Sequence, residues 1–303
     1  MIYSFEFTTV DNSAPAQGKP ATYSTSPVHL DEQQRLAVMP AWRAMKKYAR
    51  NAKNQNQNGQ PTDRVFTTYL KLANVIKERK LSCDNFCELG GGPGSMSLYL
   101  LSRHATCRGT GITLADKDKH WTWFESLRAN PRFTALEGDL MSDVAVDMLR
   151  EHGPYDLVIA DAGEDSSVRQ ESTSFGMLAA EARLATQIVC LGGNYIMKIY
   201  DTFLLETQTM LWSLAHVFDK IVITHGVAVR VTNSERYLVC AGYKGLAADI
   251  PDDFSSAFVK FLDKANNRAV ELRHSCELAT TMGFDAMPES ISELDAIKYF
   301  DGL

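Results

Sequence analysis

The feature that most constrains this chain is an alternation of short apolar runs with longer helical stretches between Asp84 and Lys244. Such alternation is typical of a mostly parallel sheet whose strands are joined by helices. The last two predicted strands are joined by a segment too short for a crossover helix, so we expect the seventh strand to run antiparallel to its neighbours. The predicted fold class is therefore α/β, a Rossmann-like, doubly wound, seven-stranded sheet with helical extensions at both ends. The strands are expected near residues 85–89, 107–113, 133–137, 155–160, 194–199, 219–225 and 236–243.

Composition changes on both sides of this region. Residues 1–61 contain a Ser-, Thr- and Pro-rich arm, a helical stretch with a basic end, and a polar run from Asn54 to Pro61 that has little apolar surface to bury. Residues 62–245 form the predicted core. Residues 246–303 form a C-terminal extension whose apolar side chains recur at helical spacing.

Charge and composition restrict the possible classes. The chain of 303 residues is 45% hydrophobic, which suffices for a globular core, and its formal net charge is -6. No global positive field attracts nucleic acid, so any such contact must come from local basic patches. The six cysteines lack metal-ligand spacing, and no apolar run approaches the ~18 residues that span a bilayer. We expect buried thiols, no metal site, and a soluble cytoplasmic protein without a secretory signal.

A glycine-rich turn follows the first predicted strand. Its glycines permit positive φ angles and let the backbone approach a ligand closely. The turn lacks the lysine of a phosphate-binding loop, and the acidic Glu88 ahead of it disfavours a pyrophosphate. A carboxylate there suits the ammonium and sulfonium of S-adenosylmethionine, although the turn alone leaves a nucleotide cofactor equally open. The candidate cofactor residues in this run are Glu88, Gly90, Gly91, Gly92, Pro93, Gly94 and Ser95.

Residues after the next two strands extend the candidate cofactor site. Asp139, followed by Leu140, comes directly after the third predicted strand, where a carboxylate can accept a hydrogen bond from an adenine amino group. Thr113 ends the second strand, and Asp116 follows it near the usual place of a ribose-binding acid. Because Asp116 lies beyond the strand end, its position disfavours an NAD-dependent oxidoreductase, which needs that acid firmly placed.

Three later strands carry reactive side chains at their ends. Asp161 follows the fourth strand, Lys198 ends the fifth, and Glu235 begins the seventh. The carboxyl ends of parallel strands are where open α/β sheets bind ligands. A buried strand rarely ends in an unpaired charge, so Lys198 is not readily explained as a surface lysine. A lysine beside carboxylates can be tuned into a proton acceptor.

Taken in order, the glycine turn and these side chains resemble the FtsJ-like family of RNA 2′-O-methyltransferases over roughly residues 63–245. The resemblance implies S-adenosylmethionine as cofactor and RNA as substrate. It also implies a catalytic tetrad of Lys71, Asp161, Lys198 and Glu235, with Asp161 bordering the cofactor as well. Lys77 and Lys80 lie on the same helix as Lys71 and are alternatives to it. We expect Lys198 to accept the ribose proton, with its pKa lowered by partial burial and by the charge of Lys71.

The substrate within that family is less constrained. A helical arm containing Trp42, together with a C-terminal extension, resembles the layout of cap methyltransferases and favours a viral enzyme. The expected target is the first nucleotide of capped mRNA, with partner proteins of a capping or replication complex and, for a virus, the host cytoplasm as location. Ribosomal RNA, transfer RNA or internal riboses are the alternative, ahead of an oxidoreductase or a non-catalytic RNA-binding relic. The basic helix is expected to contact RNA through Arg43, Lys46, Lys47 and Arg50.

Overall fold

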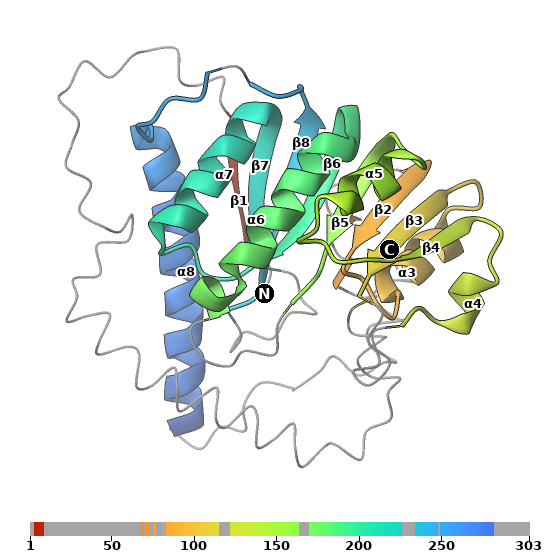
Figure 1. Cartoon of the computed structure of the whole chain (residues 1–303). Helices are drawn as coiled ribbons and strands as arrows, with labels where there is room; N and C mark the ends of the chain where they lie inside the picture. The colour runs from red at the N-terminus through yellow and green to blue at the C-terminus, as the bar shows by residue number, and fades with distance from the viewer. Residues whose placement is uncertain are drawn as a thin grey trace.

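The described part of the chain forms a mixed sheet with helices packed on both of its faces (Figure 1). This computed structural model gives only the backbone of residues 3 and 274–281. It describes residues 3–8, 68, 71–72, 75–76, 81, 83–114, 122–163, 170–225, 234–247 and 249–281.

The strands follow the order β1-β7-β8-β6-β5-β2-β3-β4 across the sheet. Strand β8 is antiparallel to both β6 and β7, while β6, β5, β2, β3 and β4 are mutually parallel. The doubly wound fold and its antiparallel seventh predicted strand are thereby confirmed. The strands are β1 (Tyr3–Thr8), β2 (Asn85–Leu89), β3 (Arg108–Thr113), β4 (Phe133–Glu137), β5 (Tyr155–Ala160), β6 (Val189–Ile199), β7 (Phe218–His225) and β8 (Arg236–Tyr243).

The sheet has one strand more than the sequence predicts. Residues 3–8 fall in the expected N-terminal arm, yet they form β1, which pairs antiparallel with β7 from Tyr3↔His225 to Thr8↔Lys220. The expectation of seven strands was wrong because the partner of β1 lies more than two hundred positions away in sequence. Weak local periodicity gives no sign of such a distant pairing.

Helices cover the sheet in two layers. In the view of Figure 1, α5, α6 and α7 lie in front of the sheet, and α8 runs along its β1 edge. One buried core joins these four helices to the sheet, and a second joins α3, α4 and the helical residues around Leu72 to the opposite face. The helices are α3 (Ser95–Arg103), α4 (Glu125–Arg128), α5 (Val144–Arg150), α6 (Gln170–Ile188), α7 (Leu205–Val217) and α8 (Ser256–Thr281).

Strand alternation decides which reactive side chain faces which layer, because successive side chains point to opposite faces. Ile196 and Tyr237 belong to the second core, the one formed with α3 and Leu72. Lys198 and Glu235 lie two residues from them and so face the same layer. Arg236 points the other way, toward α8, where it bonds the carbonyl of Ala265 at 3.3 Å.

Segments from both expected extensions pack against the sheet. Phe7 of β1 and Phe258 of α8 have ring centroids 5.3 Å apart, and both belong to the core under β7. The boundaries at residues 61 and 245 stay predictions, since the polar linker before residue 61 lies outside the described residues. None of the described helices combines the length and apolarity needed to cross a membrane.

Candidate active site

Strand register brings Asp161, Lys198 and Tyr237 side by side. Ala160 of β5 pairs with Met197 of β6, so the next residues, Asp161 and Lys198, are neighbours. Lys198 in turn pairs with Tyr237 of β8. The Nζ atom of Lys198 donates a hydrogen bond to the main-chain oxygen of Asp161 at 2.6 Å and lies 3.3 Å from Asp161 Oδ1.

Lys71 reaches the same site from a helix on that face. Its Nζ atom lies 2.6 Å from Oε1 of Glu235. Leu72, Val75 and Ile76 are buried in the core beside it and hold this helical segment against the sheet. The four side chains predicted from the resemblance therefore meet at one point, with Lys71 paired to Glu235 and Lys198 paired to Asp161.

Tyr237 links the two ion pairs and was not among the predicted site residues. Its hydroxyl donates to Asp161 Oδ1 at 3.1 Å and lies 3.4 Å from Glu235 Oε1. A phenol between two carboxylates can donate to only one of them at a time. Its position in the sequence, two residues after Glu235 on one strand, signals that it shares the face of that carboxylate.

Neighbouring charges shift the pKa values of Glu235 and Lys198, which are both buried. Burial opposes ionisation of Glu235, but Lys71 and Lys198 outweigh it and lower the pKa of this carboxyl. Burial alone would lower the pKa of Lys198, which is 8% exposed, but Asp161, Tyr200 and Glu235 raise it overall. The expectation of a lowered pKa for Lys198 was therefore wrong for the chain alone. The positive charge of Lys71, which was expected to lower it, is paired with Glu235.

The glycine turn lies between β2 and α3, at the carboxyl end of the sheet. Gly90 and Gly94 have φ angles of 64° and 107°, which L side chains rarely adopt. A Cβ atom at Gly90 would also overlap Ala162, so the turn lies directly against the segment that follows Asp161. The turn therefore places half-buried backbone beside the segment that follows Asp161.

Glu88 lies beneath this turn and contacts the protein itself. Its carboxylate accepts hydrogen bonds from the Ser97 hydroxyl and from the Ser97 N–H, the latter at 3.0 Å. It thus caps the first turn of α3, where unpaired N–H groups favour an acceptor. Burial, aided by Asp161, raises its pKa to about 8 against the opposing bonds from Ser97. A direct contact of Glu88 with the cofactor stays a prediction.

The other predicted cofactor residues differ in exposure. Thr113 and Leu140 are buried at the carboxyl ends of β3 and β4. Asp139 is exposed, and its Oδ1 atom accepts a hydrogen bond from Met141 N at 2.9 Å, which holds the turn. Asp116 and the candidate RNA contacts lie outside the described residues, the latter being Arg43, Lys46, Lys47 and Arg50.

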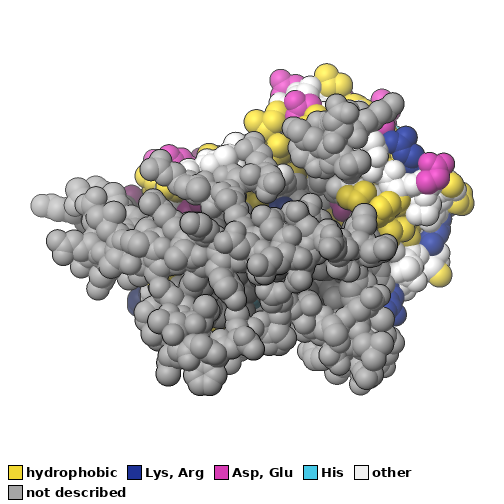
Figure 2. Space-filling view, turned by 90° about the horizontal axis from the view of Figure 1, so that it is seen from below, with side chains coloured by type: hydrophobic (Ala, Val, Ile, Leu, Met, Phe, Trp, Pro, Cys, Tyr) yellow, Lys and Arg dark blue, Asp and Glu magenta, His cyan; other side chains and the backbone are white. Residues whose placement is uncertain are grey.

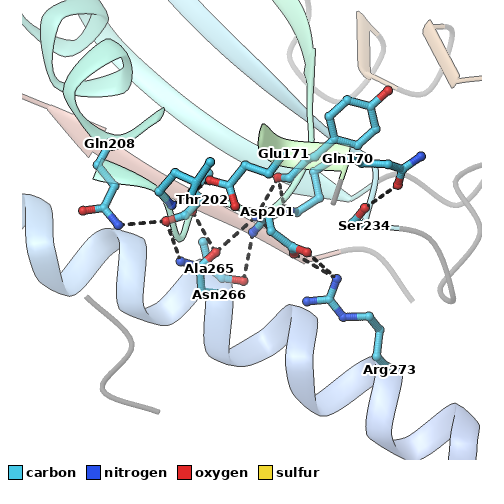
Figure 3. Close-up of polar contacts among 12 residues, drawn as sticks. Gln170, Glu171, Asp201, Thr202, Gln208, Ser234, Ala265, Asn266 and Arg273 are labelled. Atoms are coloured by element: carbon cyan, nitrogen blue, oxygen red, sulfur yellow. Dashed lines mark hydrogen bonds and ion pairs between the residues drawn. The ribbon is translucent and has the colours of Figure 1, made fainter. Parts of the chain in front are cut away.

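A buried polar cluster joins α8 to the strand ends that carry Lys198 and Glu235 (Figure 3). Arg273 of α8 bonds both carboxylate oxygens of Asp201, at 2.8 and 3.1 Å. Arg236 donates to the carbonyl of Tyr200 at 2.8 Å and to Asn266 Oδ1 at 3.1 Å. The C-terminal extension is therefore bonded directly to the residues that follow Lys198 and Glu235.

Comparison with known proteins identifies the family. The model of the FtsJ-like methyltransferase family matches residues 68–243, which is more than half of the chain. The chain belongs to the FtsJ-like methyltransferase family. The matched segment runs from the helix of Lys71 to the end of β8 and thus contains the whole site described above. The family resemblance expected from the sequence is confirmed.

Several proteins similar to this chain have names that state an activity. A cap-specific mRNA (nucleoside-2′-O-)-methyltransferase of Autographa californica nuclear polyhedrosis virus is 32% identical over 169 residues, 52% of this chain and 63% of the relative. Proteins named cap-specific mRNA (nucleoside-2′-O-)-methyltransferase 1 are 31% identical in Leishmania braziliensis, over 58% of this chain and 49% of the relative, and 26% identical in Caenorhabditis elegans, over 70% and 24%. The chain spans less than two thirds of the length of each of these relatives.

S-adenosylmethionine is the cofactor of this FtsJ-like methyltransferase, as the sequence predicted. The residues present fit it. Gly90 and Gly94 take left-handed φ angles, and side chains of the protein, Ala162 and Leu127, occupy the space where their Cβ atoms would lie. A buried acid with a raised pKa, Glu88, lies beneath the turn, and a cation bound above it favours its ionised form.

The coloured part of the face seen in Figure 2 shows no broad basic field. In Figure 2, Lys and Arg side chains alternate with Asp, Glu and hydrophobic side chains on the part of this view that carries colour. This agrees with the net charge of -6. Any RNA contact made by the described residues must therefore depend on local geometry more than on long-range attraction.

Proposed function

We propose that this protein methylates the 2′-hydroxyl of an RNA ribose, and that its target is the first transcribed nucleotide of capped mRNA. The observation that carries the proposal is the meeting of Lys71, Asp161, Lys198 and Glu235 at the carboxyl end of the sheet, beside the glycine turn. The relatives named cap-specific 2′-O-methyltransferases support the choice of a cap.

The residue types suit this chemistry. A ribose hydroxyl is a weak nucleophile and must lose its proton as its oxygen bonds the methyl carbon. Lys198 Nζ takes that proton, and the main-chain oxygen of Asp161, 2.6 Å away, holds the resulting ammonium. When bound, S-adenosylmethionine supplies the transferable methyl group and a positive charge that lowers the pKa of a nearby amine.

The remaining members hold the acceptor in place. Lys71 neutralises the charge of Glu235, so that Glu235 and Asp161 can lie close together without strong repulsion between their carboxylates. Tyr237 lies between the two carboxylates, donates to Asp161 and keeps them apart. Positioning of a hydroxyl in line with a methyl group is worth several orders of magnitude in rate, roughly 7–11 kcal/mol at best.

The test is transfer of a tritiated methyl group from S-adenosylmethionine to two RNAs of one sequence, one capped and one ending in a triphosphate. Nuclease digestion then locates the label. We expect label on the 2′-oxygen of the first transcribed nucleotide of the capped RNA. Equal labelling of both RNAs along their length would replace the cap with internal riboses as the target. Label on a base, or none on either RNA, would overturn the proposed activity.

Variants of Lys198 test the proton acceptor. Lys198→Ala should abolish transfer while leaving cofactor affinity within about threefold, because the residue acts in the transition state. Lys198→Arg should fail as well, since a guanidinium stays protonated. Lys220→Ala is a matched control, because Lys220 pairs with Glu6 at 3.4 Å on the β1 edge, and it should leave turnover unchanged. Near-normal turnover in the arginine variant would assign the proton to another group.

A further inference from the structure

One peptide group separates Lys198 from a second buried acid. The carbonyl of Asp161 accepts the hydrogen bond of Lys198 Nζ at 2.6 Å. The N–H of Ala162 donates to Glu181 Oε1 at 2.9 Å. These two groups belong to the same planar peptide unit, so the side chain that holds one of them also orients the other. Glu181 therefore fixes the carbonyl that holds Lys198.

Glu181 reaches this peptide from the opposite side of the sheet. It lies on α6 among Leu178, Ala182 and Leu184, whose side chains pack in the first core. Its side chain is 0% exposed, and its Oε2 atom has no hydrogen-bond partner in the described part of the chain. Burying a carboxyl with one unmatched oxygen is costly, whereas its neighbours on α6 show that an apolar side chain packs there. Packing alone therefore does not account for an acid at this position.

We propose that Glu181 is a positioning residue that sets the pH at which Lys198 becomes a free amine. The inference rests on the proposed function, in which Lys198 accepts the ribose proton. A negative charge on Glu181 strengthens the Asp161 carbonyl as an acceptor and favours the ammonium form of Lys198. Glu181 therefore has two opposed effects on Lys198. It holds the amine firmly in place, and it makes the amine harder to deprotonate.

The other charged and titratable groups around Lys198 do not duplicate this role. Asp161, directly after β5, and Glu235, directly before β8, are themselves members of the tetrad, and Tyr200 follows the last residue of β6. Lys71 is engaged by Glu235. Glu181 acts from the other layer of the sheet, through main chain. Burial raises its pKa to about 8, while Lys198 lowers it, so the carboxylate is ionised over the alkaline range in which Lys198 loses its proton.

The experiment compares Glu181→Gln with the wild-type full chain. Glutamine has the same size and keeps an oxygen that can accept the Ala162 N–H, so the variant removes the charge and retains the contact. We expect Lys198 to lose its proton at a pH lower by about one unit, a shift of the size that one nearby charge produces. The rate of single-turnover methyl transfer rises with pH as Lys198 loses its proton, and this rise should also move about one pH unit lower. At pH values below the rise, the variant should therefore be about tenfold faster than the wild type.

Two readouts and two further variants make the result decisive. The ionisation of Lys198 is followed directly by competitive acetylation and mass spectrometry, alongside the rate. Glu171→Gln is the matched control, because Glu171 is a half-buried acid on the same helix that accepts the Leu204 N–H at 2.9 Å. This variant should change neither the ionisation of Lys198 nor the rate profile. Glu181→Asp keeps the charge and should hold the rise in rate at a pH close to that of the wild type.

The outcomes separate this inference from the proposed function. A slower Glu181→Gln variant with unchanged Lys198 ionisation would overturn the inference and reduce Glu181 to a structural residue. So would an aspartate variant that shifts Lys198 as far as glutamine does. A shift in Lys198 ionisation with no shift in the rate profile would support the Glu181–Lys198 coupling and refute Lys198 as proton acceptor. The acetylation readout needs no RNA, so it decides the inference even if methyl transfer fails.

Discussion

Lys71 Nζ lies 2.6 Å from Glu235 Oε1, so the first and last members of the tetrad form one largely buried ion pair. They come from a helix before the glycine turn and from the start of the last strand. Breaking one partner of such a pair leaves the other charge buried without its counter-ion. This pair therefore affects both the stability of the fold and the geometry of the site.

Lys71→Met should lower the free energy of unfolding by about 3 kcal/mol and reduce methyl transfer at least a hundredfold, because Glu235 loses its nearest cation. The double variant Lys71→Met with Glu235→Leu should regain most of the stability and none of the activity. Urea unfolding at neutral pH and single-turnover kinetics measure both effects. A double variant as unstable as the single one would contradict this reading of the pair.

Gly163→Ala should impair catalysis without unfolding the protein. A Cβ atom there would lie 2.9 Å from Lys198 Nζ and 3.3 Å from the Tyr200 hydroxyl, so Lys198 must shift. We expect kcat to fall about tenfold or more, since small displacements of a catalytic group cost orders of magnitude. Thermal denaturation should change little, because Gly163 is exposed.

Gly176→Ala is the matched control for that substitution. Gly176 lies exposed on α6, and among the described residues a Cβ there would meet only Met141 Cε at 3.9 Å. Alanine in an exposed helix interior should add about 0.5–1 kcal/mol of stability and leave turnover unchanged. Equal losses of activity in the two alanine variants would show that Gly163 has no special relation to Lys198.

Glu88 predicts a pH dependence of stability. Its pKa rises from an ordinary 4.5 to about 8 in the folded protein, chiefly through burial. Its favourable contribution is therefore complete below about pH 4.5 and is lost as the pH rises to about 8, because the folded state holds a proton that the unfolded state has released. Glu88→Gln, which retains an acceptor for Ser97, removes this loss.

The measurement is urea unfolding of wild type and Glu88→Gln at about pH 5.5 and about pH 8.5. We expect the variant to gain a few kcal/mol relative to the wild type between these two values. A constant difference between the proteins at both pH values would mean that Glu88 is already ionised in the fold.

The cluster in Figure 3 predicts that α8 stabilises the core through Asp201. Arg273→Met should cost about 3 kcal/mol, because the half-buried Asp201 then keeps, among the described residues, only the more distant cation of Arg236, 3.8 Å away. At a temperature at which the variant is still folded, turnover should stay close to that of the wild type, since Lys198 keeps its own hydrogen bonds. The control, Arg268→Met, removes a surface pair with Glu271 and should cost under about 0.5 kcal/mol. Equal costs for the two variants would refute a structural role of Arg273.

Much of the fold was readable from local pattern. The apolar runs predicted the strands β2–β8 to within about one residue, except that β6 begins at Val189 and not near residue 194, because a buried strand in a doubly wound sheet must be apolar along most of its length. The same pattern located Asp161, Lys198 and Glu235 at strand ends, where chemistry gathers in such sheets. The alternation of side chains that starts at Glu235 and continues along β8 also indicates that Tyr237 lies on the same face as Glu235.

Contacts between distant segments were decided only by the tertiary structure. The sequence alone determined where the strands β2–β8 lie along the chain, which reactive residues stand at their ends, the glycine turn and the family. It did not determine that β1 would pair with β7, that Lys71 would meet Glu235, or that Glu181 would approach Lys198 from the far side of the sheet. Each of these depends on which elements pack together, and so did the raised pKa of Lys198. Charge balance at a buried site is set by neighbours in space, and local sequence spacing carries no record of them.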